Sequence, residues 1–515
     1  MGIPIIDLFA GPGGLGEGFT SVVDENKNRV FKIALSIEKD EFAHKTLTLR
    51  SFIRQFPYKQ LPVEYYQFAR GEIKDVEELY KLYPTEAANA KQEAWKFELG
   101  NPTTHDEIDK RIRKSLHGQK NFGVIGGPPC QAYSLVGRAR RQEKEGLNKE
   151  DKRVYLYREY YRILAQHRPA FFIMENVKGL LSSKVENELI FSQLVSDLKD
   201  PIEAYKKLKG QEKIYKSRIN YKIYSLVEHS KEDIFGDYEP KNFIIRTEDF
   251  GIPQTRHRVI LLGIRSDLNV TPDLLRSFET KISVEKVLSG LPPIRSALSK
   301  AEDGKDEWKQ AFLDLKTSQI SKQIADDVWK IMAEVIDTLS SPEKDKGSNF
   351  VESNVTVEYN PVWYLDQELK GACNHESRSH IKEDLHRYLF VSCFAIAKGH
   401  SPKLSDFPQA LLPKHRNVGS GISENKFADR FRVQLKGQPS KTITSHISKD
   451  GHYFIHPDPL QCRSLTVREA ARIQTFPDNY FFCGPRTQQF HQVGNAVPPL
   501  LSKQLAEIVF HSLFR

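Results

Sequence analysis

A cysteine follows two prolines in residues 126–134, GGPPCQAYS, directly after a short apolar run. The prolines fix φ and remove backbone donors, so they hold Cys130 in a stiff loop. A lone cysteine is more often a small buried apolar residue, but loop-forming neighbours favour a nucleophile here. Such a thiol needs a lowered pKa, because the thiolate is its reactive form.

A carboxylate closes another apolar run, FFIMENV, at Glu175. Burial disfavours the charged form of a carboxyl, and the raised pKa suits a proton donor to a base ring. A helix cap or a surface ion pair explains Glu175 equally well when this motif is taken alone. Arg256 and Arg258 alternate in QTRHR, so an extended backbone projects them to one face. There they could hold a phosphate, a base carbonyl or the cysteine loop, unless they are simply solvated at a strand edge.

A glycine-rich motif, DLFAGPGGLG, follows the apolar run at residues 3–9. Glycines let the backbone turn sharply and approach a ligand at the start of a helix. Glu38 ends the next apolar run, where its carboxylate can accept hydrogen bonds from ribose hydroxyls. The spacing of Gly11, Gly13 and Gly16 also fits a dinucleotide fingerprint, so a Rossmann oxidoreductase remains an alternative, as does a purely structural turn.

Two further motifs stand near the end of the chain. In RSLTVREAARIQTFP, Thr466 and Glu469 have the spacing of a capping box, which also suits a helix with a scaffold role only. The motif GNAVPP then forms a rigid turn before the last helix. Cys373 and three nearby histidines have irregular spacing without a paired Cys-x-x-Cys, so we expect no metal site.

Apolar strands that alternate with helices must position these groups. This alternation predicts an α/β fold with a Rossmann-like, mostly parallel sheet covered by helices on both faces. A smaller irregular domain is expected beside it. Residues 51–120 are expected to be an insertion, and residues 500–514 an amphipathic helix. The strands are expected at residues 3–9, 31–38, 122–126, 170–175 and 259–264. The expected parts are a catalytic and cofactor-binding domain (1–265), an irregular domain (266–461), and a hinge helix with a C-terminal helix (462–515).

Composition limits the class of protein. The 515 residues carry a net charge of +9, which favours a polyanionic partner. No run approaches the roughly 18 uncharged apolar residues of a membrane helix, and no signal peptide is recognisable. Five scattered cysteines indicate a reducing compartment rather than a disulfide framework. We therefore expect a cytoplasmic protein, associated with the nucleoid if its partner is DNA.

Taken in order, the six motifs resemble those of the DNA cytosine-5 methyltransferase family, in its prokaryotic modification form. The resemblance implies transfer of a methyl group from S-adenosyl-L-methionine to C5 of a cytosine flipped out of double-stranded DNA. By resemblance, Cys130 is the covalent nucleophile, Glu175 protonates N3, and Arg256 and Arg258 steady the base and the cysteine loop. The match covers roughly residues 1–50, 122–182, 245–265 and 438–515.

The resemblance also assigns the cofactor contacts. Glu38 would bind the ribose, whereas Lys39 stands where the family usually has an aromatic residue. The nearest match to the family's acid before Ile at the third strand is GEI, so Glu72 is expected to bind the adenine amino group. The remaining expected contacts are Phe9, Gly11, Gly13, Gly14, Pro129, Leu156, Asn495 and Val497.

By the same resemblance, residues 266–461 form a target-recognition domain, with Arg378, Arg430 and Arg432 as preferred DNA contacts. A monomer is expected, and a cognate restriction endonuclease acting separately would suit the family. A tRNA cytosine methyltransferase remains an alternative, although its loop usually has Thr after the aromatic residue, where Ser134 stands here. A non-catalytic DNA-binding relative is disfavoured because Cys130 and Glu175 are intact. The recognised DNA sequence does not follow from these motifs.

Overall fold

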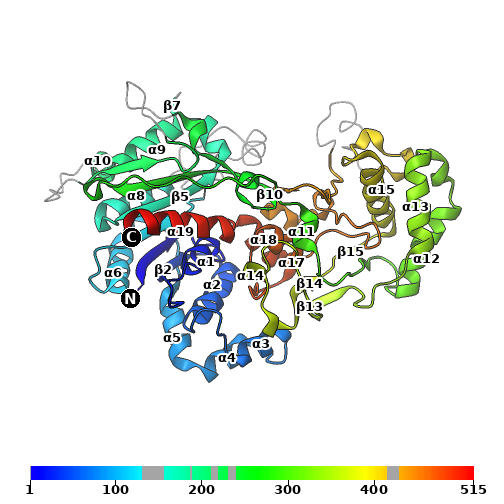
Figure 1. The fold of residues 1–515 in the computed structure, drawn as a ribbon, viewed down its shortest axis with the longest axis horizontal. Helices are drawn as coiled ribbons and strands as arrows, with labels where there is room; N and C mark the ends of the chain where they lie inside the picture. Colours follow the sequence, from blue (N-terminus) through cyan, green and yellow to red (C-terminus); the bar gives the residue numbers. More distant parts are fainter. Residues whose placement is uncertain are drawn as a thin grey trace.

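Two lobes make up the computed structural model (Figure 1). One lobe holds a large sheet with helices on both of its faces, and the other holds a group of long helices. The first and last helices of the chain lie together in the sheet lobe. The structure describes residues 2–129, 156–185, 188–209, 219–229, 239–413 and 429–514.

The large sheet has the strand order β3-β2-β1-β4-β5-β11-β8, with β9 also paired to β11. The strands from β3 to β5 are parallel, and β11 runs antiparallel to its neighbours. The predicted mostly parallel α/β sheet is therefore confirmed. Because the chain leaves β1 toward β2 and later returns to β4 on its other side, the carboxyl ends of β1 and β4 form the crevice where such sheets bind ligands. The strand bounds are β1 Ile3–Leu8, β2 Phe31–Glu38, β3 Ala94–Lys96, β4 Gly123–Gly126, β5 Phe171–Val177, β8 Tyr221–Tyr224, β9 Ile244–Arg246 and β11 His257–Arg265.

Helices cover both faces of this sheet, as predicted. Apolar side chains of α1 and α19 pack on one face, and those of α6, α8 and α9 pack on the other. A Cβ on Gly18 would lie 2.4 Å from the Cβ of Ser502, so α1 and α19 can touch only because residue 18 lacks a side chain. The helix bounds are α1 Gly14–Thr20, α2 Glu41–Arg54, α6 His105–Leu116, α8 Leu156–His167, α9 Ile190–Lys199, α10 Pro201–Lys209 and α19 Pro499–Leu513.

The expected insertion at residues 51–120 is only partly an insertion. Three helices, α3 Val63–Arg70, α4 Val76–Leu82 and α5 Pro84–Glu93, pack with the apolar side of α2 around a separate apolar cluster that Leu369 and Cys373 also join. The segment that follows them, however, supplies β3 and α6, which belong to the main sheet and its covering layer. A three-residue edge strand inside a charged stretch carries too little periodicity to be seen in the sequence.

The second lobe is helical rather than irregular. Its longest helices are α12 Lys305–Thr317, α13 Asp326–Thr338 and α15 Lys382–Lys398, which enclose a separate apolar core. Trp308, Phe312 and Leu315 recur at the spacing of one helix face and are buried there. Two short strand pairs accompany them. The strands β12 Ala297–Leu298 and β15 Ser379–His380 pair just before α15, whereas the pair of β13 Gly347–Glu352 and β14 Gly371–Glu376 contacts α3 and the helix α17 Val467–Ile473.

The helix α17 Val467–Ile473 connects the two lobes. Its predicted capping box is confirmed: Thr466 Oγ1 accepts from the Glu469 N–H, and Glu469 Oε2 accepts from the Thr466 N–H. The side chains of Arg463, Arg468 and Arg472 are buried and donate to carbonyl groups of several segments. The remaining elements are α11 Val284–Leu288, α14 Pro361–Tyr364, α18 Arg486–Asn495, β6 Lys184–Val185, β7 Glu188–Leu189, β10 Gln254–Thr255 and β16 Ser440–Lys441.

Among the described residues, no helix is long and apolar enough to cross a membrane.

Candidate active site

The glycine-rich loop after β1 lies against the turn that follows α18. Phe9, Gly11 and Gly13 have φ of 55°, 58° and 98°, so this loop uses left-handed backbone that glycine adopts at little cost. A Cβ on Gly14 would lie 2.4 Å from the carbonyl oxygen of Val497, so that contact requires glycine. A Cβ on Gly11 would meet no described atom within 4 Å, so the loop has open space on that side.

Glu38 fixes this loop from the end of β2. Its Oε2 accepts from the backbone N–H of Gly11 at 2.8 Å, and its Oε1 accepts from that of Asp40 at 2.7 Å. Burial raises the pKa of this carboxyl, and the two backbone donors act in the opposite direction. Each oxygen keeps a free acceptor position, so the group can still bind hydroxyls at the crevice.

The expected position of the third-strand carboxylate needs correction. Glu72 follows helix α3 rather than a strand, and its Oε1 pairs with Arg70 Nε. The strand next to β2 is β3, and the acid that follows it is Glu98. Lys39 Nζ lies 3.1 Å from Glu98 Oε1, which places this carboxylate beside the end of β2. Sequence matching missed Glu98 because its neighbour is Leu99 rather than Ile and because β3 was not recognised.

Other predicted cofactor residues lie around the same edge. Leu156 begins α8, and a Cβ on Gly100 would lie 2.5 Å from its Cδ2, so the start of α8 meets the segment after β3. Pro129 follows β4 after a short loop and is half-buried. Asn495 ends α18, where its side-chain nitrogen lies 3.1 Å from His491 Nδ1.

An acid–arginine pair lies on the neighbouring strands β5 and β11. The Nε of Arg258 lies 2.9 Å from Oε1 of Glu175, and both side chains are largely buried. Burial lowers the pKa of Arg258, while the Glu175 carboxylate opposes that shift. A Cβ on Gly127 would lie 2.9 Å from Oε2 of Glu175, so the loop after β4 passes directly over the second carboxylate oxygen.

Cys130 lies outside the described residues, as do residues 131–155. The described range 2–129 ends at Pro129, two positions after Gly127, the glycine that lies over Glu175. The first part of the GGPP segment is therefore brought to the acid–arginine pair.

The two arginines of QTRHR have different partners. Arg256 is fully buried, and its Nη1 donates to the carbonyl of Ile443 at 2.7 Å and to that of Gly494 at 3.3 Å. Burial lowers its pKa well below the usual value. Arg258 contacts the acid, whereas Arg256 holds two backbone segments in place.

The arginines expected to contact DNA also differ from one another. Arg378 Nη2 donates to the carbonyl of Ile447, and its guanidinium lies 4.3 Å from the centre of the Phe490 ring. Burial lowers its pKa to about 10. Its side chain is half-buried among these protein contacts, and its predicted contact with DNA stays a prediction. Arg432 pairs with Asp429, and Arg430 lies beside them in the chain.

Asp7 is a buried carboxyl that sequence reasoning passed over. It lies in β1, and neither of its oxygens has a hydrogen-bond partner among the described residues. Burial raises its pKa to about 8; Arg54 opposes this shift, while Glu38 and Glu93 add to it. The sequence signal that could have indicated this burial is an acidic residue inside the apolar run IPIIDLF.

No cluster of three or more possible metal ligands occurs in the described parts of the chain. The residues considered for zinc have separate partners: Cys373 donates to Ala69, His375 contacts Thr466 and Pro292, and His386 contacts Ala311.

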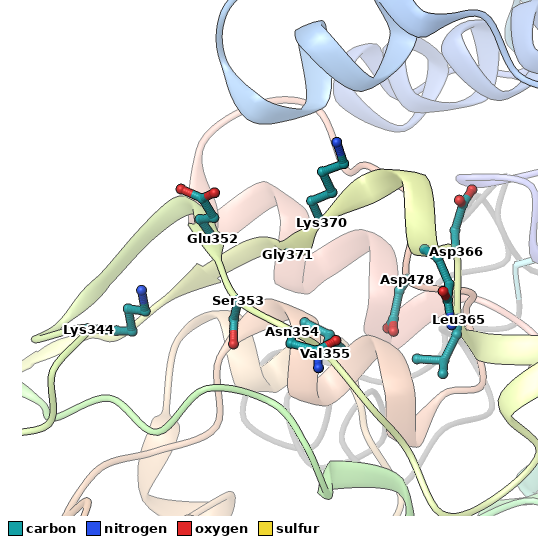
Figure 2. A pocket seen from close by; sticks show the side chains of 11 residues that line it. Lys344, Glu352, Ser353, Asn354, Val355, Leu365, Asp366, Lys370, Gly371 and Asp478 are labelled. Atoms are coloured by element: carbon teal, nitrogen blue, oxygen red, sulfur yellow. The ribbon is translucent and has the colours of Figure 1, made fainter.

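A polar cavity of about 420 Å³ lies elsewhere, beside the β13–β14 pair (Figure 2). Basic side chains such as Lys370 and acidic ones such as Asp478 face it together. Asp478 also pairs with the buried Arg472, so it has a structural partner already. None of the described residues that line this cavity belongs to the predicted site.

Comparisons with known proteins agree on one family. The chain matches the model of the C-5 cytosine-specific DNA methylases over residues 84–201 and 226–511. The type II methyltransferase M.Bpa9945I of Bacillus paralicheniformis is 33% identical, over 98% of this chain and 98% of that protein. The type II methyltransferase M.DdeI of Desulfomicrobium norvegicum is 26% identical, over 98% of this chain and 87% of that protein. The DNA (cytosine-5-)-methyltransferase M.ApeKI of Aeropyrum pernix is 27% identical, over 78% of this chain and 83% of that protein. The chain therefore belongs to the family of C-5 cytosine-specific DNA methylases and is a DNA (cytosine-5-)-methyltransferase of the type II modification class.

Proposed function

We propose that this enzyme transfers a methyl group from S-adenosyl-L-methionine to C5 of a flipped-out cytosine in a specific duplex sequence, with Cys130 as covalent nucleophile. The observation that carries this proposal is the Glu175–Arg258 pair beneath the glycine of the GGPP segment. It places a carboxyl oxygen with a fixed orientation two strands from the glycine-rich loop, at the carboxyl edge of the sheet.

Residues around the crevice fit the cofactor. Gly11 leaves open space on one side of the loop, while Gly14 and Val497 close the other side. Glu38 would receive the ribose hydroxyls, and Glu98, in place of Glu72, would receive the adenine amino group. When bound, the cofactor supplies an electrophilic methyl group. Phe9, Gly13, Pro129, Leu156 and Asn495 complete the proposed contacts.

The protein's own groups then act on the base. Flipping takes the cytosine out of the stack so that both of its faces become accessible. The thiolate of Cys130 forms a bond to C6, and N3 receives a proton from the Oε2 side of Glu175. Arg258 holds the other oxygen, Oε1, so the acid keeps one orientation while its proton moves. With the cofactor bound, C5 would accept the methyl group. Solvent water would then take the C5 proton, the C–H electrons would form the C5–C6 double bond and expel Cys130 as a thiolate, and N3 would return its proton to Glu175.

We propose that the second lobe recognises the DNA sequence. The acid, the arginine and the cysteine act on an extruded base and cannot select its neighbours, so base edges must be read elsewhere. The net charge of +9 supports binding to the phosphate backbone. We propose that the enzyme acts as a monomer in the cytoplasm, with any cognate endonuclease acting separately.

A covalent trap tests the nucleophile. With cofactor present, a duplex carrying 5-fluorocytosine at the target should remain attached to the wild-type enzyme in a denaturing gel, because fluorine cannot leave as a proton does. Cys130→Ala should give no adduct and no turnover, while binding of S-adenosyl-L-methionine stays close to wild type.

Cys483→Ala is the matched control, since this free cysteine packs against the apolar cluster of α2 to α5 and should leave the adduct unchanged. Normal turnover by Cys130→Ala would end the proposed mechanism.

A further inference from the structure

Two buried glutamines connect the QTRHR segment, which carries Arg256 and Arg258, with the turn against which the glycine-rich loop lies. Gln254 is fully buried, two residues before Arg256. Its Nε2 donates to Oε1 of Gln474 and to the carbonyl of Ile473 at 3.1 Å. Its Oε1 accepts from the backbone N–H of Ile443 at 3.1 Å. Both ends of the Gln254 amide are therefore used.

Gln474 continues this chain of hydrogen bonds. It follows α17, is fully buried, and its Nε2 donates to the carbonyl of Ala496. The next residue, Val497, presents its carbonyl to Gly14 at the position that a Cβ would fill. One side chain thus joins the strand segment at Gln254 to the turn against which the glycine-rich loop lies.

A second connection reaches the same turn. Arg256 donates from Nη1 and Nη2 to the carbonyl of Gly494, each at 3.3 Å. A Cβ on Gly494 would lie 2.3 Å from the backbone nitrogen of Ser445, so this part of the turn is closely packed as well. The turn is therefore held from the strand side at Gly494 and at Ala496.

We infer that Gln474 is a positioning residue, which sets the position of the segment Gly494–Val497, the end of α18 and the turn after it, relative to the glycine-rich loop and so the width of the cofactor site. This inference rests on the proposed function, because it takes the loop at Gly14 as the place where S-adenosyl-L-methionine binds. The position needs one group that donates and one that accepts at a fixed separation, which a carboxamide provides. Without the donor, the buried carbonyl of Ala496 has no partner and the turn shifts to find one.

Two substitutions at Gln474 separate its role as acceptor for Gln254 from its role as donor to Ala496. Gln474→Met keeps the shape but loses both hydrogen bonds. Gln474→Glu keeps the acceptor for Gln254 but turns a carboxylate oxygen toward the Ala496 carbonyl. Calorimetric titration with S-adenosyl-L-methionine alone should show affinity weakened about tenfold in either variant, the effect expected for one unsatisfied buried carbonyl. The KM for the cofactor should rise, while kcat at saturating cofactor and the KM for DNA stay within a few-fold of wild type.

Gln492→Met is the matched control. Gln492 is buried two residues before Gly494, and its Nε2 donates to the carbonyl of Cys483 at 2.9 Å, outside the connected chain. Its loss should lower the melting temperature as much as the Gln474 variants do, but leave cofactor affinity unchanged. Gln254→Met cuts the same chain from the strand side, and it carries the test if the Gln474 variants do not fold.

The outcomes are distinct. Wild-type affinity in folded Gln474→Met, or an equal loss of affinity in Gln492→Met, overturns the positioning role. A wild-type enzyme that does not bind S-adenosyl-L-methionine overturns the proposed function instead.

Discussion

Three carboxyl groups near the edge of the sheet have different surroundings. Glu175 is paired with a guanidinium, Glu38 accepts from two backbone N–H groups, and Asp7 has no hydrogen-bond partner among the described residues. Because the environment sets which form of a carboxyl is stable, these residues are suited to different tasks. Glu175 is held in one orientation by Arg258, Glu38 is held as an acceptor, and Asp7 favours its neutral form.

Replacing Glu175 by Gln keeps the shape of the side chain but removes the transferable proton. We expect kcat to fall by about 10²–10⁴-fold, as for loss of a general acid, while cofactor affinity changes little. Single-turnover methylation of a duplex at saturating enzyme measures the chemical step directly. Activity within a few-fold of wild type would assign Glu175 a structural role only.

Asp7 makes stability depend on pH in an unusual direction. Its pKa of about 8 in the fold exceeds the ordinary value of 3.8, so between these values the folded chain holds a proton that the unfolded chain lacks. The free energy of unfolding therefore falls as pH rises from about 4 to about 8, by at most roughly 1.4 kcal/mol per pH unit. Above pH 8 this group causes no further fall. Asp7→Asn removes this dependence.

Thermal unfolding across this range provides the measurement. The melting temperature of Asp7→Asn should exceed that of wild type by a margin that grows from pH 5 to pH 8. Asp106→Asn, at an exposed position, should show no such trend. A margin independent of pH would contradict the assignment of Asp7.

At the level of elements, the short helix α17 carries much of the connection between segments. Arg463 pairs with Glu469, and Arg472 pairs with Asp478, all four side chains being buried. Arg472 also donates to carbonyl groups near residues 287, 289 and 356. The scaffold role that the sequence left open for this motif therefore accounts for its buried arginines.

Thr466→Val tests the start of this helix. The isosteric change removes the cap of the Glu469 N–H and the contact at 2.9 Å with His375 Nδ1. A lost cap typically costs about 1 kcal/mol, which for a chain of this size lowers the melting temperature by about 1 °C. Thr338→Val, at an exposed helix position, should change it by less than half as much. Equal melting temperatures for both variants would show that the cap contributes nothing.

The elements that sequence reasoning found are those with strong local patterns. The strands of the glycine motif, Glu38 and Glu175 are apolar runs bounded by turns, and each was placed within a few residues. The strand β3 was missed because three residues carry no period, and Glu98 was missed with it. The separate partners of Arg256 and Arg258 arise from tertiary contacts with residues 443 and 494, which no local pattern encodes.

The two lobes of the whole molecule are not divided at the expected boundary of residues 266–461. Val287, Trp363, Ile443 and Phe454 lie in the apolar cluster of the sheet lobe, although the sequence placed them in the second domain. The separate core of the second lobe is built around α12, α13 and α15. An exchange of the entire expected domain, residues 266–461, would therefore disrupt the apolar core of the sheet lobe.

Specificity should move with a narrower segment. We expect that exchanging residues 299–341 and 382–433 with the equivalent segments of a relative of different specificity redirects methylation to the relative's sequence. The stretch between them, which includes the sheet-lobe core residue Trp363, stays in place. The contacts of Ile443 with Gln254 and Arg256 remain in such a chimera. Bisulfite sequencing of DNA from cells that express it maps the methylated sites. An active chimera that still methylates the original sequence would place recognition outside the second lobe.

The contact between the beginning and the end of the chain has a consequence for biosynthesis. Ser502 Oγ donates to the carbonyl of Leu15, and Tyr480 OH donates to that of Pro12, so the glycine-rich loop is completed by residues translated hundreds of codons later. Closing so long a loop costs little more entropy than closing a shorter one, because the cost grows with the logarithm of its length. It does, however, fix the order of events during synthesis, because domains fold as they leave the ribosome. In the nascent polypeptide the glycine-rich loop therefore reaches its final packing only after the second lobe, where we propose that DNA is recognised, has been synthesised.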